Sequence, residues 1–222
     1  MIKTIEYLDD EGIRDTAKIS HEPDSCPVCH IGIEPIFFAA YGEVGGESLQ
    51  IVYRCPKKKC DNLFIAYYSK YKDFFLLKFT APQTVKKRQF TEIIQELSGN
   101  FCKIYNQAYE AEKRNLLEIC GAGYRRALEF LIKDYAIKKN EKDKEKISRM
   151  FLSSCINEYI DEGRIKSCAE RAAWLGNDEV HYYRTWEDKD LKDLKNLIEL
   201  TVNWIELVLR SDKYNREMKK PA

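Results

Sequence analysis

The stretches CPVC, residues 26–29, and CPKKKC, residues 55–60, decide how the first part of this 222-residue chain folds. Each stretch carries two cysteines on a short turn, and the 25 residues between Cys29 and Cys55 suffice for two strands and a return. Zinc prefers four soft donors in a tetrahedron, and two such knuckles supply two thiolates each. We therefore predict one structural zinc ion per chain, bound by Cys26, Cys29, Cys55 and Cys60. His30 directly follows Cys29, so its side chain is expected to point away from the metal.

The expected location of the chain bears on how its cysteines are interpreted. The opening residues lack the apolar core of a signal peptide, and no run of about 18 apolar residues is present to span a membrane. The chain is therefore predicted to be cytoplasmic, where paired cysteines act as metal ligands more often than as disulfides.

Four further cysteines stand singly on helical stripes and are interpreted as small buried apolar residues. They are Cys102, Cys120, Cys155 and Cys168.

Short segments rich in aromatic and branched residues predict β-strands around the two knuckles. These segments are residues 35–41, 48–53, 63–68 and 74–79, with turns at 42–46 and 69–73. Five of the six prolines also lie in the first 82 residues. We predict a small antiparallel β zinc-ribbon domain over residues 1–82.

From residue 83 onward the apolar spacing changes to that of helices, and no proline occurs between Pro82 and Pro221. Two apolar stripes have helical spacing: Phe90, Ile93, Ile94 and Leu97, then Tyr124, Ala127, Leu128, Leu131, Ile132 and Tyr135. Further helices are predicted at about 100–119, 147–160, 165–175 and 188–210. The fold class is thus α+β, with an all-α domain over residues 83–222.

The overall charge argues against general attraction to polyanions. The net charge is +1, and residues 1–82 carry 10 basic against 12 acidic side chains. Any contact with nucleic acid must come from a local patch. Lys57, Lys58 and Lys59 on the second knuckle either contact phosphates or are three solvated lysines of a tight turn.

Three stretches of the second part resemble a known family: NFCKIYNQAYEAE (100–112), GAGYRRALEFLIKDYA (121–136) and WLGNDEVHYYRTWEDKD (174–190). They are similar to a bacterial domain-of-unknown-function family that occurs alone, behind a zinc ribbon, or appended to restriction-type helicase subunits. The resemblance covers roughly residues 98–210. That family is grouped with the HEPN-like helical domains, so the resemblance implies a HEPN-like bundle of four or five helices that forms a homodimer.

In HEPN-like members that cut RNA, the resemblance implies a metal-independent reaction. A histidine handles the proton of the ribose 2′-OH and an arginine stabilises charge on the phosphorus centre. His181 matches that histidine, and Asn177 matches the polar residue that commonly follows the arginine. Gly176 stands where the arginine belongs, so Arg171 or Arg184 would have to replace it in space.

The same segment also has a purely structural interpretation. Gly176 would end a helix, Asn177 or Asp178 would cap the next one, and His181 would hydrogen-bond a neighbour while Trp174 and Trp186 pack beneath.

A cluster on the preceding helix has two interpretations as well. Arg125 and Arg126 lie four and three residues before Glu129, which favours an ion pair on the helix surface. Alternatively, Glu129 and one arginine face a cleft beside His181 and bind a phosphate or a base.

Three functions follow from these residues. The leading one is a non-catalytic module associated with RNA or DNA, placed by the resemblance in bacterial defence or stress responses, with a defence-system protein as a partner and no membrane contact. The first alternative is a metal-independent endoribonuclease that uses His181 with Arg171 or Arg184. The second alternative is a protein-interaction scaffold, which would bind no nucleic acid at any salt concentration.

Overall fold

A computed structural model describes residues 2–9, 11–43 and 46–218 of the chain. The chain divides into two compact units, Met1–Lys86 and Lys87–Ala222. We call them the barrel unit and the helical unit. Their boundary lies at residue 86, against residue 82 in the sequence-based division.

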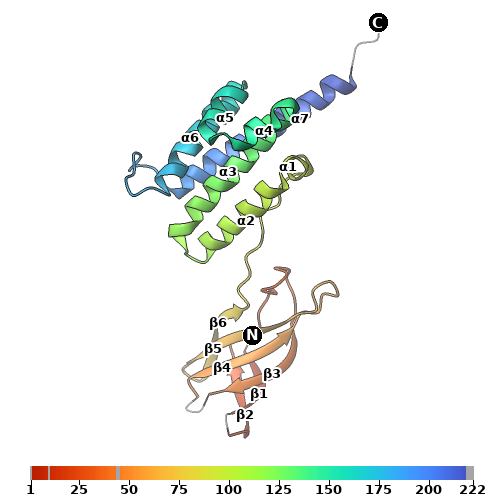
Figure 1. Cartoon of the computed structure of the whole chain (residues 1–222). Coiled ribbons are helices and arrows are strands. Elements are labelled where there is room, and N and C mark those ends of the chain that lie inside the picture. Colours follow the sequence, from red (N-terminus) through yellow and green to blue (C-terminus); the bar gives the residue numbers. More distant parts are fainter. Residues whose placement is uncertain (1, 10, 44–45, 219–222) are drawn as a thin grey trace. The chain divides into compact units, whose positions relative to one another are not determined.

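The barrel unit is a closed sheet of six strands in the order β1-β2-β6-β5-β4-β3. The strands are labelled in Figure 1. They are β1 (Lys3–Leu8), β2 (Arg14–Ile19), β3 (Ile36–Gly42), β4 (Ser48–Arg54), β5 (Leu63–Tyr71) and β6 (Phe74–Ala81). The four strands predicted from the sequence correspond to β3 through β6, which pair antiparallel in sequence order.

Alternating side chains build the core of the barrel. Along β4, Leu49, Ile51 and Tyr53 are buried while the residues between them are more exposed, which is the period of a strand with one face in the core. Phe64 and Tyr68 of β5 fill the same interior. Cys26 and Cys55 are part of this core as well, so the knuckles are anchored in the barrel.

The expected ribbon of about four strands is wrong in extent, because β1 and β2 complete a barrel. These two strands pair antiparallel with each other and then join β3 and β6 through one parallel residue pair each. Their sequences, KTIEYL and RDTAKI, are mostly polar, and Ile5, Ala17 and Ile19 alone are buried. A segment with so few inward apolar residues gives a weak strand signal, although closure of a sheet needs only that its inner face be filled.

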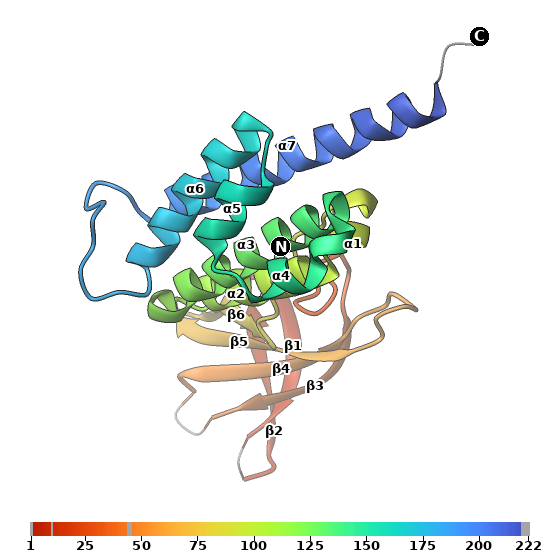
Figure 2. The same cartoon turned by 45° about the horizontal axis from the view of Figure 1, so that its top comes forward.

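The helical unit contains seven α-helices and one 3₁₀ turn within the described residues (Figure 2). They are α1 (Glu92–Leu97), α2 (Gly99–Lys113), α3 (Leu117–Lys139), η1 (Glu141–Asp143), α4 (Lys144–Arg149), α5 (Leu152–Tyr159), α6 (Gly163–Asp178) and α7 (Leu191–Glu217). None of these helices combines the length and the apolar composition that a bilayer span requires.

Helix α3 is the centre of the helical unit and contacts α2, α5, α6 and α7. The stripe predicted from the sequence is confirmed, because every member from Tyr124 to Tyr135 is fully buried. Next to it, the Phe90 ring packs edge to face on Phe101 and on Tyr105, and the Phe101 and Tyr105 rings are tilted. The centroids are 4.9–5.7 Å apart. These contacts form one continuous core for the unit.

A partly buried polar contact ties three helices together. Lys195 of α7 and the hydroxyl of Tyr124 on α3 donate to the two oxygens of Glu112 on α2, at 2.8 and 2.5 Å. Burial by itself raises the pKa of the Glu112 carboxyl, but the two hydrogen bonds outweigh it and the pKa lies below the ordinary value. The carboxylate therefore stays ionised inside the bundle.

Two predicted helices are each interrupted. The helix expected at about 100–119 ends at Lys113, because Asn115 adopts a left-handed backbone with φ of 59°. The helix expected at 147–160 is two helices, α4 and α5, separated by extended backbone at Met150 and Phe151. Apolar periodicity continues across both interruptions, so it does not reveal them.

Candidate functional site

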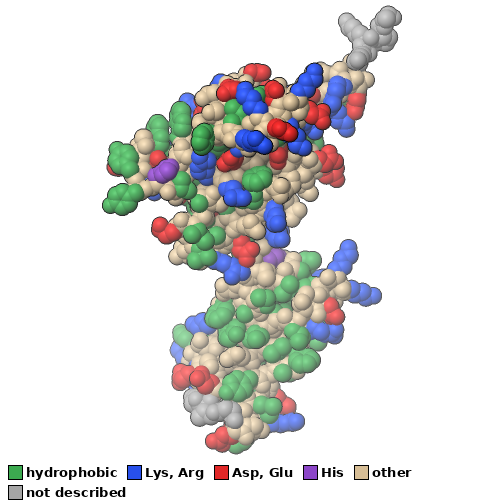
Figure 3. Space-filling view, viewed as in Figure 1, with side chains coloured by type: hydrophobic (Ala, Val, Ile, Leu, Met, Phe, Trp, Pro, Cys, Tyr) green, Lys and Arg blue, Asp and Glu red, His purple; other side chains and the backbone are tan. Residues whose placement is uncertain are grey.

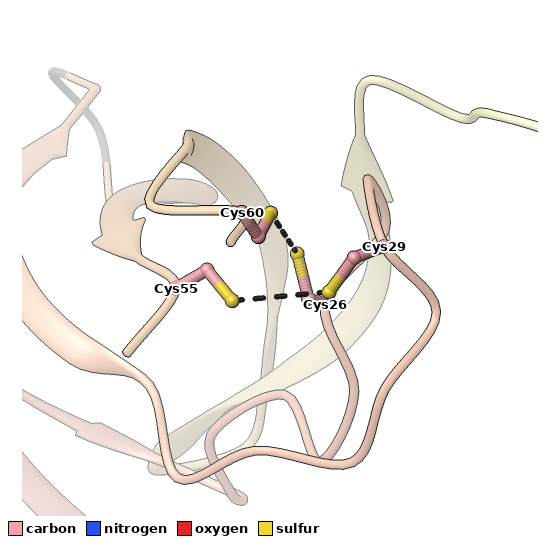
Figure 4. Close-up of side chains that lie close together, drawn as sticks. All are labelled: Cys26, Cys29, Cys55 and Cys60. Carbon is pink, nitrogen blue, oxygen red and sulfur yellow. Dashed lines mark hydrogen bonds between the residues drawn. The ribbon is translucent and has the colours of Figure 1, made fainter. Parts of the chain in front are cut away.

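Four cysteine sulfurs converge in the barrel unit, as Figure 4 shows. The Sγ atoms of Cys26 and Cys60 are 3.8 Å apart, those of Cys29 and Cys55 are 3.9 Å apart, and all four lie within 4.8 Å of one another. A disulfide needs about 2.05 Å, so these cysteines are not bonded to each other. Sulfurs on a tetrahedral ion with bonds of about 2.3 Å lie about 3.8 Å apart. The cluster could therefore bind a metal ion.

The two knuckles have matching backbone structure. In each, the N–H of the first cysteine donates to the residue two places beyond the second cysteine: Cys26 to Ile31 at 3.0 Å, and Cys55 to Asn62 at 2.9 Å. These bonds close a tight turn that holds both sulfurs of a knuckle on one side. The tip of β4 and the start of β5 carry the second knuckle, so sheet pairing sets its position.

The residue after each second cysteine closes its turn with a left-handed backbone. His30 has φ of 58° and Asp61 has φ of 48°. The Nε2 of the His30 ring lies 3.1 Å from the hydroxyl of Thr84. His30 is not one of the residues whose ligand atoms cluster, in keeping with the expectation that it is not a ligand.

Burial and hydrogen bonding shift the pKa values of three of the thiols in different directions. Burial raises the pKa of Cys26 and raises the pKa of Cys55 to about 12. Hydrogen bonds from Asn62, whose side-chain amide lies 3.5 Å from the Cys60 sulfur, lower the pKa of Cys60 to about 7. A cation among the four sulfurs would compensate the buried thiolates. With four protein donors filling a tetrahedron, such a metal would have no position for a reacting water.

The segment around His181 differs from its predicted structure at Gly176. Helix α6 continues through Gly176 to Asp178 and does not end at the glycine. A Cβ at residue 176 would lie 2.9 Å from the Cβ and Cγ atoms of Arg125 on α3. The glycine therefore permits close approach of two helices, which sequence spacing alone does not distinguish from a helix end.

Asp178 organises the loop that follows α6. Its buried carboxylate accepts hydrogen bonds from the backbone N–H groups of Thr185 and Trp186, at 3.0 and 2.7 Å. The Trp174 and Trp186 rings, which the structural interpretation packs beneath His181, stack in parallel on each other with centroids 6.0 Å apart. The cap of α7 is instead Asp190, in a capping box with Asp193.

His181 is an exposed residue of this loop, which projects from the helices in both Figure 1 and Figure 2. Its ring forms no hydrogen bond or ion pair with any residue that the structure describes, although its backbone N–H donates to Asn177. The expected hydrogen bond from the ring to a neighbour is therefore absent from the described part of the chain.

A polar pocket of about 480 Å³ brings together three other candidate residues, Arg125, Glu129 and Asn177. The Nε of Arg125 donates to Asn177 Oδ1 at 2.8 Å. The expected ion pair between Glu129 and Arg125 or Arg126 is not formed. Glu129 instead pairs with Lys133, one turn further along α3, at 2.6 Å. His181 does not line this pocket. Sequence reasoning missed three charged lining residues: Lys133, Arg149 and Glu170. The i, i+4 spacing of Arg125, Glu129 and Lys133 was the available signal.

The remaining candidate arginines lie outside this pocket. Arg126 packs over the Phe130 ring at 5.7 Å. Arg171 donates to the carbonyl and the hydroxyl of Ser167, at 2.9 and 2.6 Å. Arg184 binds Glu179 at 2.9 Å. Among the described residues of one chain, neither Arg171 nor Arg184 forms a hydrogen bond with the His181 ring.

Substituting Gly176 by alanine tests the close approach of α3 and α6. The new methyl group would overlap the Arg125 side chain near its root, so the helices must separate or the Arg125–Asn177 bond must break. We expect Gly176→Ala to lower the free energy of unfolding of the helical unit by about 1–3 kcal/mol, measured by denaturant titration. Alanine has a higher helix propensity than glycine, so propensity alone would predict that Gly176→Ala stabilises the unit. A loss of stability would therefore come from the close approach of the helices.

Gly163→Ala is the matched control, because Gly163 also lies in α6 and a Cβ there would meet no atom within 4 Å. We expect this control to be neutral or slightly stabilising. Equal effects of the two substitutions would contradict the role assigned to Gly176.

Basic side chains are unevenly distributed in the barrel unit. Residues 1–47 contain three lysines and arginines against ten acidic residues, whereas residues 48–82 contain seven against two. The basic residues of the second group are Arg54, Lys57, Lys58, Lys59, Lys70, Lys72 and Lys78. The ion pairs among the described barrel residues are Lys3–Glu22 and Arg54–Asp61, so these six lysines have no acidic partner there. The nearly balanced charge total for residues 1–82 concealed this separation. Counting charged residues separately over 1–47 and 48–82 would have found it.

Comparison with known proteins assigns the helical part. The model of a family described as Domain of unknown function (DUF4145) matches residues 106–221, slightly more than half of the chain. The chain has no match among curated proteins or solved structures.

Proposed function

This chain belongs to the family described as Domain of unknown function (DUF4145), and since that description names no activity, we propose from the chain's own residues that it is a non-catalytic, nucleic-acid-associated module. In this proposal the barrel unit carries a structural zinc ion and contacts RNA or DNA. The helical unit has, in this proposal, the HEPN-like fold that the sequence resemblance implies.

The unpaired lysines of the barrel unit carry this proposal. Lys57, Lys58 and Lys59 are all exposed at the tip of the second knuckle, and the residues that follow β4 are strongly basic. Phosphate contacts draw their free energy from such cations through release of counterions. Lysines without an acidic partner lose no ion pair when they bind a phosphate.

Zinc is the proposed metal because the donor set is four thiolates. Soft thiolate ligands in a tetrahedron favour zinc or iron–sulfur chemistry, and two short knuckles on turns are typical of structural zinc. The sulfur separations support a single tetrahedral ion. Bound there, the ion would hold the lysine-bearing turn against the barrel core.

Neutralising the knuckle lysines tests the proposed contact with nucleic acid. We expect the triple variant Lys57→Gln, Lys58→Gln and Lys59→Gln to weaken binding to RNA or DNA about tenfold or more at low salt. The slope of log K against log salt should shrink by about 2, since each lost phosphate contact removes roughly 0.7–0.9. Fluorescence anisotropy with labelled oligonucleotides at several salt concentrations measures both quantities.

The matched control removes three charges from the helical unit through Lys142→Gln, Lys144→Gln and Lys146→Gln. Its binding should equal that of the wild-type chain. Absence of binding by the wild-type chain at any salt concentration would overturn the proposal and favour a protein-interaction scaffold.

The same experiments separate the module from a metal-independent endoribonuclease. His181 is exposed, and the guanidinium groups of Arg171 and Arg184 are engaged by Ser167 and Glu179. We therefore expect intact RNA after incubation with both the wild-type chain and a His181→Ala variant. Cleavage that disappears in His181→Ala would establish the enzyme instead.

We also propose a homodimer through the helical unit, which the resemblance implies. Tyr182 and Tyr183 support this part of the proposal, because both are exposed apolar side chains on the loop that carries His181.

A further inference from the structure

The outer face of the sheet β3-β4-β5-β6 is unusually apolar for a barrel exterior. Inward residues of β4 and β5 fill the core, so the alternating residues between them face outward. Strand register places Val52 beside Ile65, and Ile65 beside Ala81. Figure 3 shows hydrophobic side chains gathered on the barrel unit over the strands that Figure 1 labels β3, β4 and β5.

An aromatic row runs across this face beside the aliphatic one. Three of the four residues in register are aromatic: Tyr41 of β3, Tyr67 of β5 and Phe79 of β6. Gln50 of β4 lies between Tyr41 and Tyr67. The rings of Tyr67 and Phe79 are stacked, with centroids 4.6 Å apart and planes 16° apart. Phe79 is 48% exposed and Tyr41 is 43% exposed. The barrel has its own core inside, so packing within the barrel does not account for these exposed rings.

Lysines lie at both ends of the strands that carry the aromatic row. At one end, the second knuckle joins β4 to β5 and carries Lys57, Lys58 and Lys59. At the other end, Lys70 and Lys72 lie at the turn between β5 and β6, and Lys72 lies over the Tyr71 ring at 5.6 Å. Lys78 is the neighbour of Phe79, beside an irregularity in the β5–β6 register. The nine residues of β5 separate the two basic ends by about 30 Å.

This combination matches a single-stranded nucleic acid better than a duplex. In a single strand the bases are free to stack on aromatic side chains, while the phosphates track basic groups along the surface. In a duplex the bases are stacked on one another, so the duplex presents mainly its phosphates to a protein. The aliphatic row of Val52 and Ile65 would not bind those phosphates. An uncharged protein partner would leave the flanking lysines without a counter-charge.

We propose that the outer face of β4, β5 and β6 binds single-stranded RNA or DNA, with bases stacking on the Tyr67–Phe79 pair and phosphates on the lysines at both strand ends. The inference rests on the proposed association with nucleic acid and names its substrate class and its site. The backbone of the bound strand runs along β5, between the knuckle and the β5–β6 turn.

The test compares binding of a labelled single strand of about 12 nucleotides with a duplex of the same sequence. The face variant is Tyr67→Leu with Phe79→Leu, which keeps apolar area but removes both ring faces. We expect the full-length wild-type chain to bind the single strand more tightly than the duplex. The face variant should lose about tenfold or more of its affinity for the single strand while it keeps its affinity for the duplex.

Two controls accompany the face variant. Tyr214→Leu with Phe151→Leu removes one exposed tyrosine and one exposed phenylalanine from the helical unit and should leave binding unchanged. Metal content and thermal melting of the face variant verify that the barrel is folded. If the face variant misfolds, the single variant Phe79→Leu replaces it. Phe79 is 48% exposed, and loss of its ring should weaken binding to the single strand and not to the duplex.

The outcomes separate this inference from the proposed function. One outcome is that the wild-type chain binds duplex and single strand equally well, the knuckle lysine variant binds both more weakly, and the face variant binds as the wild type does. This outcome would overturn the stacking face and leave the proposed function standing. No binding to either probe at low salt would overturn both. Competition by polyglutamate as effective as competition by the unlabelled single strand would identify an acidic peptide as the occupant and also overturn the inference.

Discussion

Replacing Cys55 by serine is expected to abolish metal binding and to unfold the barrel unit. Structural zinc contributes roughly 10–16 kcal/mol of binding free energy in small domains, whereas a whole domain is stable by only about 5–15 kcal/mol. Cys55 is fully buried in the barrel core, and its sulfur lies 3.9 Å from that of Cys29. Loss of this ligand removes the tetrahedral site and leaves a buried hydroxyl among the remaining thiols.

The two units can be followed separately because all three tryptophans lie in the helical unit. They are Trp174, Trp186 and Trp204. We expect Cys55→Ser to lower the metal content from about one ion per chain to none, measured by atomic absorption. Its β-sheet circular dichroism should be lost at room temperature, while the thermal transition reported by tryptophan fluorescence stays in place.

Cys168→Ser is the matched control for this experiment. Cys168 is a half-buried free thiol of α6 and has no part in the sulfur cluster. The control should keep its metal and its barrel. A Cys55→Ser chain that retains stoichiometric metal would contradict the four-ligand site, and one that loses metal without losing the sheet would contradict the stabilising role of the metal.

Leu128→Ala is expected to have the complementary effect on the helical unit. Leu128 is fully buried at the centre of α3, in the core that α3 shares with its neighbouring helices. Truncating such a side chain removes apolar burial and leaves a cavity, which costs about 2–5 kcal/mol. The tryptophan transition should move down by on the order of 10 °C, and the metal content should not change.

Leu200→Ala is the matched control, because Leu200 lies on α7 with 45% of its surface exposed. We expect its effect on the tryptophan transition to be within about 0.5 kcal/mol. A loss of metal in Leu128→Ala would contradict the division of the chain into units that fold around separate cores. Similar destabilisation by both leucine variants would contradict the central position of α3.

Much of the local structure was predictable because it leaves a periodic trace in the sequence. The four apolar strands of the barrel and the buried stripe of α3 follow from periods of two and of about 3.6 residues. The same rule failed where breaks do not disturb the period, as at Asn115 and at Met150. It also failed for β1 and β2, because their few inward residues stand among charged ones.

The candidate sites divide in the same way. Cysteine spacing identified the four residues that lie together, since two turns of a hairpin can meet in only a few ways. The helical pocket was only partly predictable. Arg125, Glu129 and Asn177 do line it, but Lys133 takes the place that Arg125 and Arg126 were expected to have beside Glu129. His181 is outside it, on an exposed loop.

By itself, the sequence determined where strands and helices form, which cysteines cluster, and which family the helical part joins, because each of these is encoded in residues near one another in the chain. Only the tertiary structure decided that β1 and β2 complete a barrel, that Gly176 makes room for Arg125, and that Tyr41, Tyr67 and Phe79 share one row across the sheet. These features depend on pairing and packing between residues far apart in the sequence, where the available space decides among contacts that local pattern leaves equivalent.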